Sequence, residues 1–133
     1  MLGEQIGEES GKITGIRVLP SGAGGPQVES SFQAAGKLLG VEVVDMGTYV
    51  ATMQPDGTMY GEGQGVLMAK DGGNASWTGQ GIGRFNANGG VSWRGAVYYR
   101  AMGSLARANS MVAVFEYETD ANQNVHARLW EWK

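Results

Sequence analysis

The 133-residue chain contains no cysteine and one histidine. The absence of cysteine excludes disulfide bonds, thiolate metal sites and cysteine nucleophiles. A lone histidine, His126, without cysteine partners argues against a dedicated transition-metal site, so we expect no metal and no cofactor. Charged residues make up 17 % of the chain, against a usual ~25 %. No apolar run approaches the ~18 residues of a membrane-spanning helix.

Positive charge is scarce as well. Ten Lys and Arg against thirteen Asp and Glu give a formal net charge of −3, and no basic stripe or polybasic cluster is visible. We therefore expect neither nucleic acid nor a membrane surface as a partner. Residues 1–10 lack the basic start and apolar stretch of a signal peptide, which predicts a cytoplasmic protein. We interpret residues 1–10 as a flexible acidic N-terminal arm and residues 11–133 as one domain.

Glycine, in contrast, is abundant: 23 of the 133 residues, more than twice the usual ~7 %. The glycines have no three-residue period, which excludes collagen. Turn residues recur between runs rich in Val, Tyr, Trp, Phe and Thr, a pattern typical of all-β sandwiches and barrels. The predicted strands are 11–19, 27–37, 39–54, 58–69, 75–85, 91–101, 110–119 and 124–132. We predict a single eight-stranded antiparallel up-and-down barrel with at most one short helical turn.

The sequence leaves the secondary structure of two segments open. Residues 29–40 alternate in polarity as a strand does, but Ser30 and Gly40 could also cap a short helix. The alternation favours the strand. Residues 103–109 contain helix-forming residues and could form one helical turn over a barrel end.

Turn chemistry predicts the register of the four central strands. The Pro-Asp-Gly sequence at 55–57 fits a type I turn closed by a glycine bulge, and we expect five-residue loops at 70–74 and 86–90. The expected closing pairs are Gln54 with Thr58, Ala69 with Ala75 and Phe85 with Val91. A shift of one residue would bury three charged side chains, since it exchanges the two faces.

This register gathers an apolar set on one face, which we take as the barrel interior. The expected inward side chains are Val43, Asp45, Tyr49, Met53, Met59, Leu67, Trp77, Phe85, Val91, Trp93, Val97 and Tyr99. Eight glycines share this face: Gly47, Gly61, Gly63, Gly65, Gly79, Gly81, Gly83 and Gly95. Glycine within a strand costs ~0.5–1 kcal/mol relative to alanine, so a stripe of them needs a reason. The two open alternatives are that aromatic rings fill the space and that a real cavity remains.

The candidate polar site lies on the same face. Asp45 is predicted to point inward beside Tyr49, where desolvation would raise its pKa and suit it to general acid or base chemistry. A structural role for Asp45, bonded to backbone or solvent, is the alternative. The expected cavity walls are Trp77, Phe85, Trp93, Tyr99 and Tyr117. We expect His126 to lie outside, whereas Glu131 shares the face of Leu129 and could point inward.

The opposite face is not fully polar. Its apolar members on the central strands are Val44, Met46, Val50, Val66, Met68, Ile82, Ala96 and Tyr98. An exterior this apolar predicts a covered surface, and a homo-oligomer (dimer or trimer) is the simplest way to cover it.

Two strand motifs carry a resemblance to known proteins. Residues 60–68 read Tyr-Gly-Glu-Gly-Gln-Gly-Val-Leu-Met, and Trp77-Thr78-Gly79 is followed by Arg84-Phe85. Over about residues 40–103 the chain resembles a bacterial barrel family of unknown function and, through it, the calycin-type allene oxide cyclase barrels, to which the dirigent proteins are similar. That resemblance implies an oligomeric barrel. In the plant enzymes a carboxylate and a bound water isomerise a fatty-acid epoxide, and Asp45 corresponds to that carboxylate by analogy only.

Three functions follow from these observations. The first is binding of a small apolar ligand in the barrel. The second is a cofactor-independent cyclase or isomerase, in which the cavity folds the substrate and Asp45 transfers a proton. The third is a structural or interaction protein with a filled barrel.

Overall fold

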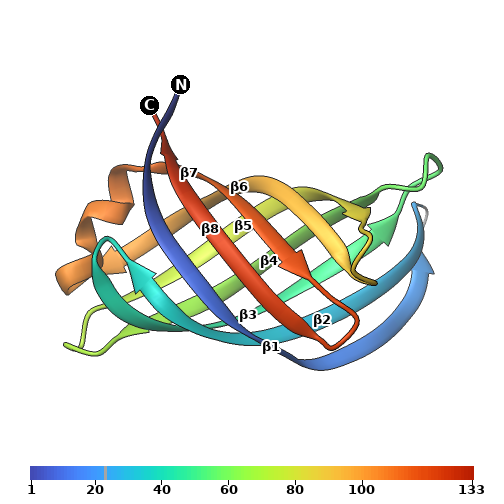
Figure 1. Cartoon of the computed structure of the whole chain (residues 1–133), viewed down its shortest axis with the longest axis horizontal. Coiled ribbons are helices and arrows are strands. Elements are labelled where there is room, and N and C mark those ends of the chain that lie inside the picture. The colour runs from blue at the N-terminus through green and yellow to red at the C-terminus, as the bar shows by residue number, and fades with distance from the viewer. Residues whose placement is uncertain (23) are drawn as a thin grey trace.

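All eight predicted strands form, and they close into one antiparallel barrel (Figure 1). This computed structural model describes residues 1–22 and 24–133. Each strand pairs with the next along the chain, and the first pairs with the last. The strands are β1 Leu2–Gly22, β2 Gly25–Leu38, β3 Val41–Met53, β4 Met59–Ala69, β5 Asn74–Phe85, β6 Val91–Met102, β7 Val112–Thr119 and β8 Asn124–Trp132. The predicted all-β up-and-down barrel is therefore confirmed.

The region before residue 11 differs from the sequence-based expectation. It was predicted as a flexible arm, but β1 begins at Leu2 and pairs with β2 and with β8. Residues 2–10 thus form part of the barrel wall. The predicted turn at 20–26 includes Ala23, which lies outside the described residues.

The two undecided segments are a strand and a helical turn. Residues 29–38 belong to β2, and the chain reverses at Leu39 and Gly40, both with positive φ. Residues 103–110 form the 3₁₀ helix η1 (Gly103–Ser110), which buries Leu105 and Ala108 in the core at one end of the barrel (Figure 1). None of the helices in the described part of the chain is long and apolar enough to cross a membrane.

The central register is confirmed at two turns and wrong at the third. Gln54 faces Thr58 through a backbone hydrogen bond, and Phe85 pairs with Val91. Between β4 and β5, however, Ala69 bonds to Gly73, so that Leu67 and not Ala69 faces Ala75. The register there is shifted by two residues. Because the side-chain period of a strand is two, the predicted inward and outward faces are unaffected.

The core consists of two clusters, one toward each end of the barrel. The cluster beside η1 contains Leu38, Leu67, Leu105 and other fully buried side chains. The second contains Phe32, Met59, Trp93, Tyr117 and Val125, and the rings of Trp77 and Phe115 pack against both.

One predicted interior position is wrong. Phe85 is 66 % exposed. It is the last residue of β5, and β4 pairs with β5 only as far as Gly83, so no strand flanks Phe85 on that side. Its ring lies at the barrel rim.

The glycine stripe makes room for two tryptophans. A Cβ atom at Gly65 would lie 2.4 Å from the Trp77 ring, and one at Gly47 2.5 Å from it. Gly61 and Gly83 leave the same space for Trp93, with distances of 2.5 and 2.9 Å. Each indole therefore lies flat against two glycines. Gly63, Gly79 and Gly81 have no indole against them and border a hollow part of the interior.

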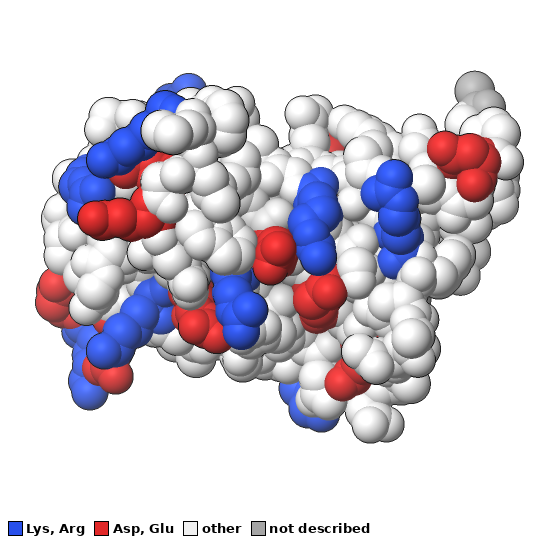
Figure 2. Space-filling model, turned by 45° about the horizontal axis from the view of Figure 1, so that its top comes forward, with Lys and Arg blue, Asp and Glu red and all other residues white. Residues whose placement is uncertain are grey.

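The face in Figure 2 mixes both signs of charge with uncharged residues. Lys and Arg pair with nearby carboxylates there, as in the contacts of Arg94 with Glu116 and Glu118. Four apolar side chains form a patch on β3 and β4 in which all are 43–53 % exposed: Val44, Met46, Val66 and Met68. The apolar exterior predicted from the sequence is thus present.

Gly65→Ala should destabilise the protein by about 1–3 kcal/mol, since the added methyl group overlaps Trp77 in a packed interior. Urea unfolding measures the effect. Gly15→Ala is the matched control: a Cβ there meets nothing within 4 Å, so its unfolding free energy should stay within ~0.5 kcal/mol of the parent. Equal stability of the two variants would show that the stripe is not needed for ring packing.

Candidate functional site

The site is built on a hydrogen bond that spans three strands. The Trp77 indole on β5 lies across Gly65 of β4 and Gly47 of β3. Its Nε1–H donates to Asp45 Oδ1 on β3, at 2.8 Å. Asp45 is 6 % exposed. A buried carboxyl needs such partners, because losing water without replacement is costly.

A second carboxyl contacts Asp45. Glu9 on β1 is also 6 % exposed, and its side chain is in hydrogen-bonding contact with Asp45. Burial, and to a smaller extent the charge of Asp45 and the contact with it, together raise the pKa of Glu9 to about 9. Burial also raises the pKa of Asp45, an effect that the Trp77 and Glu9 hydrogen bonds oppose. At neutral pH the pair holds a shared proton, with Glu9 donating to the Asp45 carboxylate.

Aromatic side chains surround this pair. Burial raises the pKa of the Tyr99 phenol, and so do the charges of Glu9 and Asp45. Burial likewise raises the pKa of Tyr49 and of Tyr117. All three phenols therefore stay protonated and can donate a hydrogen bond.

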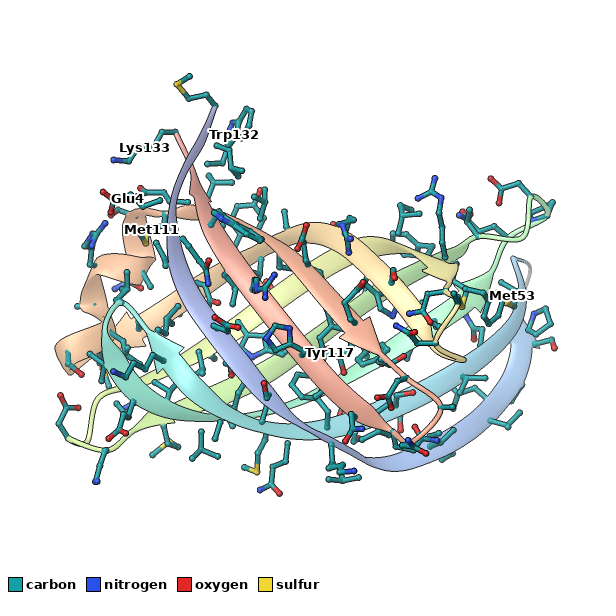
Figure 3. The ribbon with its side chains drawn as sticks, in the orientation of Figure 1. Glu4, Met53, Met111, Tyr117, Trp132 and Lys133 are labelled. Carbon is teal, nitrogen blue, oxygen red and sulfur yellow. The ribbon has the colours of Figure 1, made fainter. Side chains whose placement is uncertain are left out.

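The rings form one packed group. Tyr49 meets Tyr117 edge-on, with ring centroids 5.6 Å apart, and meets Trp93 at 5.7 Å. Phe32 packs against Tyr117 at 5.4 Å. In Figure 3, Tyr117 lies in the middle of the barrel, between Met53 at one end and Met111 beside η1. The group occupies the region where the two core clusters meet.

The rings do not fill the interior. A cavity of about 100 Å³ remains beside them. The side chains that border it include Glu9, Phe32, Ala34, Asp45, Tyr49, Trp77, Trp93, Val97, Tyr99, Phe115, Tyr117, Val125, Ala127 and Leu129, with Gly61, Gly63, Gly79 and Gly81. Glu62 and Gln80 also border the cavity, but both are exposed. Apart from the carboxyl and phenol groups, the buried side chains around it are apolar. Both sequence-based alternatives are therefore partly right: rings and empty space coexist.

Two buried polar atoms at this cavity lack a partner. Neither Glu9 Oε1 nor the Tyr117 hydroxyl makes a hydrogen bond of normal geometry within the described residues, although the neighbouring Tyr49 phenol contributes to the raised pKa of Tyr117. Their residues are 6 % and 8 % exposed, and both line the cavity. Unpaired buried polar atoms are rare in native proteins, because each forfeits its hydration without compensation.

The structure brings most of the predicted site residues together. Asp45, Tyr49, Trp77, Trp93, Tyr99 and Tyr117 all border the cavity. Phe85 does not, because it lies at the rim. Glu9 was missed, since residues 1–10 were assigned to an arm. The alternation of side chains along β1 could have indicated that Glu9 faces inward. It shares a strand face with Gly7, Gly11 and Ile13, which are small or apolar.

The other titratable candidates lie outside the cavity. His126 is half-exposed, as predicted, with its Nε2 2.7 Å from Glu8 Oε2. Glu131, considered as a possible inward group, pairs with Arg107 on η1 at 3.6 Å. The described residues contain no group of three or more His, Asp or Glu placed to hold a metal ion.

Comparison with known proteins identifies the fold alone. No protein-family model and no curated protein matches the chain. Among solved structures, a protein of unknown function from Clostridium acetobutylicum ATCC 824 is similar, with a TM-score of 0.84, 10 % identity and 98 % of each chain covered. A conserved protein of unknown function from Rhodopseudomonas palustris has a TM-score of 0.82 and 11 % identity, covering 98 % of this chain and 97 % of its own. A β-barrel-like protein from Acinetobacter baumannii AYE has a TM-score of 0.83 and 12 % identity, covering 100 % and 96 %.

Glu9 should make the protein less stable as the pH rises. Its folded-state pKa lies above the ordinary value of 4.5, so its contribution is fully present below pH 4.5 and is lost as the pH rises toward 9. We expect Glu9→Gln to become more stable than the parent by a few kcal/mol between pH 5 and pH 9, given ~1.4 kcal/mol for each pKa unit.

Urea unfolding at several pH values measures this difference. Glu4→Gln, an exposed substitution on the same strand, is the control and should follow the parent. Parallel curves for the parent and Glu9→Gln would mean that Glu9 titrates normally in the folded protein.

Proposed function

We propose that this protein binds a small, mainly apolar molecule inside the barrel. The observation that supports this function is the pair of unpartnered polar atoms, Glu9 Oε1 and the Tyr117 hydroxyl, at an otherwise apolar cavity. A bound molecule with one polar end would satisfy them, while its apolar part contacts the rings. Such a combination of apolar walls and a few convergent polar groups is typical of ligand sites.

The size of the cavity limits the ligand. An apolar cavity of about 150 Å³ in another protein takes up benzene, so about 100 Å³ suits a small ring or a short alkyl chain. The proposed kinship with the allene oxide cyclase-like barrels agrees with an interior ligand. A fatty-acid derivative of the kind those plant enzymes convert would need a larger space than this one.

Filling the cavity should abolish binding. Ala34→Leu places a larger side chain beside Asp45, where Ala34 borders the cavity. Ala35→Leu, the next residue on β2, is the control because Ala35 is exposed on the outer face. We expect ligand-observed NMR with one-ring probes (cyclopentanol, cyclopentylamine and cyclohexanone) to detect binding to the parent and to Ala35→Leu, and none to Ala34→Leu.

No binding of any probe to the parent would favour the filled-barrel alternative, in which the interior is purely structural. Thermal unfolding of both variants checks that Ala34→Leu keeps its fold.

A cofactor-independent isomerase is the second candidate, and the shared proton favours it. Two contacting carboxyls whose pKa values differ provide a neutral acid, Glu9, beside a charged base, Asp45. The base could remove a proton next to a carbonyl group while the acid donates to the carbonyl oxygen. Such a reaction requires no cofactor.

Proton removal can be measured without knowing the substrate. If the site acts in this way, cyclohexanone in D₂O should exchange its α-hydrogens faster with the protein than with buffer, and Asp45→Asn should lose about 10²-fold or more of that increase. Asp56→Asn, at an exposed turn, is the control. Binding of cyclohexanone without faster exchange would leave ligand binding as the function and exclude this catalysis.

The apolar patch on β3 and β4 supports the prediction of a homo-oligomer, which stays a prediction together with the cytoplasmic location. Sedimentation of the parent and of Met46→Glu would test the oligomer, because a charge in the centre of the patch should dissociate it. A monomeric parent would contradict it.

A further inference from the structure

The charged groups around the cavity are all of one sign. Glu9 and Asp45 face it, whereas no Lys, Arg or His of the described chain borders it. Several basic side chains pair instead with carboxylates on the outer surface, as Arg128 and His126 do with Glu8. The residue next to Glu9 thus has two basic neighbours, and Glu9 has none.

A buried acidic pair without a cation is unfavourable, and among the described residues only the Trp77 hydrogen bond and a retained proton compensate for it. One oxygen of Asp45 accepts from Trp77. Glu9 contacts Asp45 as well, but its Oε1 has no partner among the described residues. The site therefore offers a free acceptor and a negative charge in a place from which water is largely removed, where an electrostatic contact is strongest.

The aromatic walls of the cavity also favour a cationic group. Trp77, Tyr99 and Tyr117 line the cavity together with the two carboxyls. The negative face of an aromatic ring attracts a cation, with tryptophan the most effective ring. An anionic ligand would meet two carboxyls and ring faces with no basic side chain to receive it.

A metal ion fits this site poorly. Calcium takes six to eight oxygen ligands, whereas Glu9 and Asp45 are the only buried carboxyls that line the cavity in the described chain; Glu62, which also borders it, is exposed. A primary ammonium group needs three acceptors, and its carbon skeleton can fill the apolar remainder.

We propose, resting on the ligand-binding function above, that the ligand is a small primary amine whose ammonium group binds to Glu9 and Asp45. Glu9 Oε1, the Tyr117 oxygen and the Asp45 carboxylate accept hydrogen bonds from its three N–H groups, and the alkyl or ring portion contacts Trp77 and Tyr99. The amine arrives as R–NH₃⁺, and Glu9 releases its own proton to solvent as it becomes a carboxylate. Binding therefore exchanges one cation for one proton, and the charge of the site is conserved.

Three probes that differ by one heavy atom separate charge from shape: cyclopentylamine, cyclopentanol and methylcyclopentane. Calorimetric titration at pH 7 should give a Kd for the amine at least tenfold below that of the alcohol, since hydrogen bonds to charged groups are the stronger ones. Repeating the amine titration in buffers of different ionisation enthalpy should show close to one proton released per amine bound.

Two neighbouring substitutions test the location. Glu9→Gln should reduce the preference for amine over alcohol to about twofold or less and should abolish proton release. Glu8→Gln removes a carboxylate from the outer face of the same strand. It should change neither the preference for amine over alcohol nor the proton release. Thermal unfolding verifies that the two variants fold.

Each outcome is decisive. Equal affinity for amine and alcohol overturns the amine assignment and leaves the proposed binding function standing. An amine preference that survives Glu9→Gln overturns the assignment to this pair. Binding of none of the three probes overturns both proposals.

Discussion

The contact between Trp77 and Asp45 is the constraint on which the interior depends. The indole must cross two strands to reach the carboxylate, and it can do so only because Gly65 and Gly47 have no side chains beneath it. The strands lose some intrinsic stability through these glycines. In return a large ring is held flat against the wall, its N–H is satisfied, and a carboxylate is fixed deep in the barrel.

The position of Asp45 in turn determines the chemistry of the cavity. Its charge helps to keep the proton on Glu9 and raises the pKa of the Tyr99 phenol. Carboxyl and phenol groups are thus held in defined protonation states within an apolar enclosure. Both proposed functions draw on this property. A binding site uses the charge and the free acceptor, whereas an isomerase would use the difference in pKa between the two acids.

Much of the barrel could be predicted from the sequence because two strong patterns agree. The alternation of side chains sets which residues face inward, and the turn residues set the pairing. The one error of register came from treating residues 70–74 as a longer loop than Pro55-Asp56-Gly57. In the structure both turns have the same hydrogen bonds: Thr58 N bonds to Asp56, and Gly73 N bonds to Asp71. Recognising Lys70-Asp71-Gly72 as the same turn would have given the correct pairing.

The site was harder to predict than the fold. Asp45 and five of the six aromatic candidates could be placed because they lie on strands with clear alternation. The prediction for Phe85 was wrong because a side chain on the inward face of a strand is not buried where the neighbouring strand has already ended. Glu9 was missed for a different reason. Adjacent glutamates in a charged segment are typical of a solvated terminus, and only the closure of β1 onto β8 makes one of them an interior group.

That closure has a consequence for how the barrel assembles. Seven of its eight strand pairings join neighbours along the chain, whereas the pairing of β1 with β8 joins residues such as Glu9 and Ala127 from opposite ends. Among the eight pairings, this one closes the longest loop and therefore has the largest cost in chain entropy. It is also the step that removes Glu9 from water. Because a glutamate of ordinary pKa is ionised at neutral pH in the unfolded chain, closing the barrel is coupled to the uptake of a proton by Glu9.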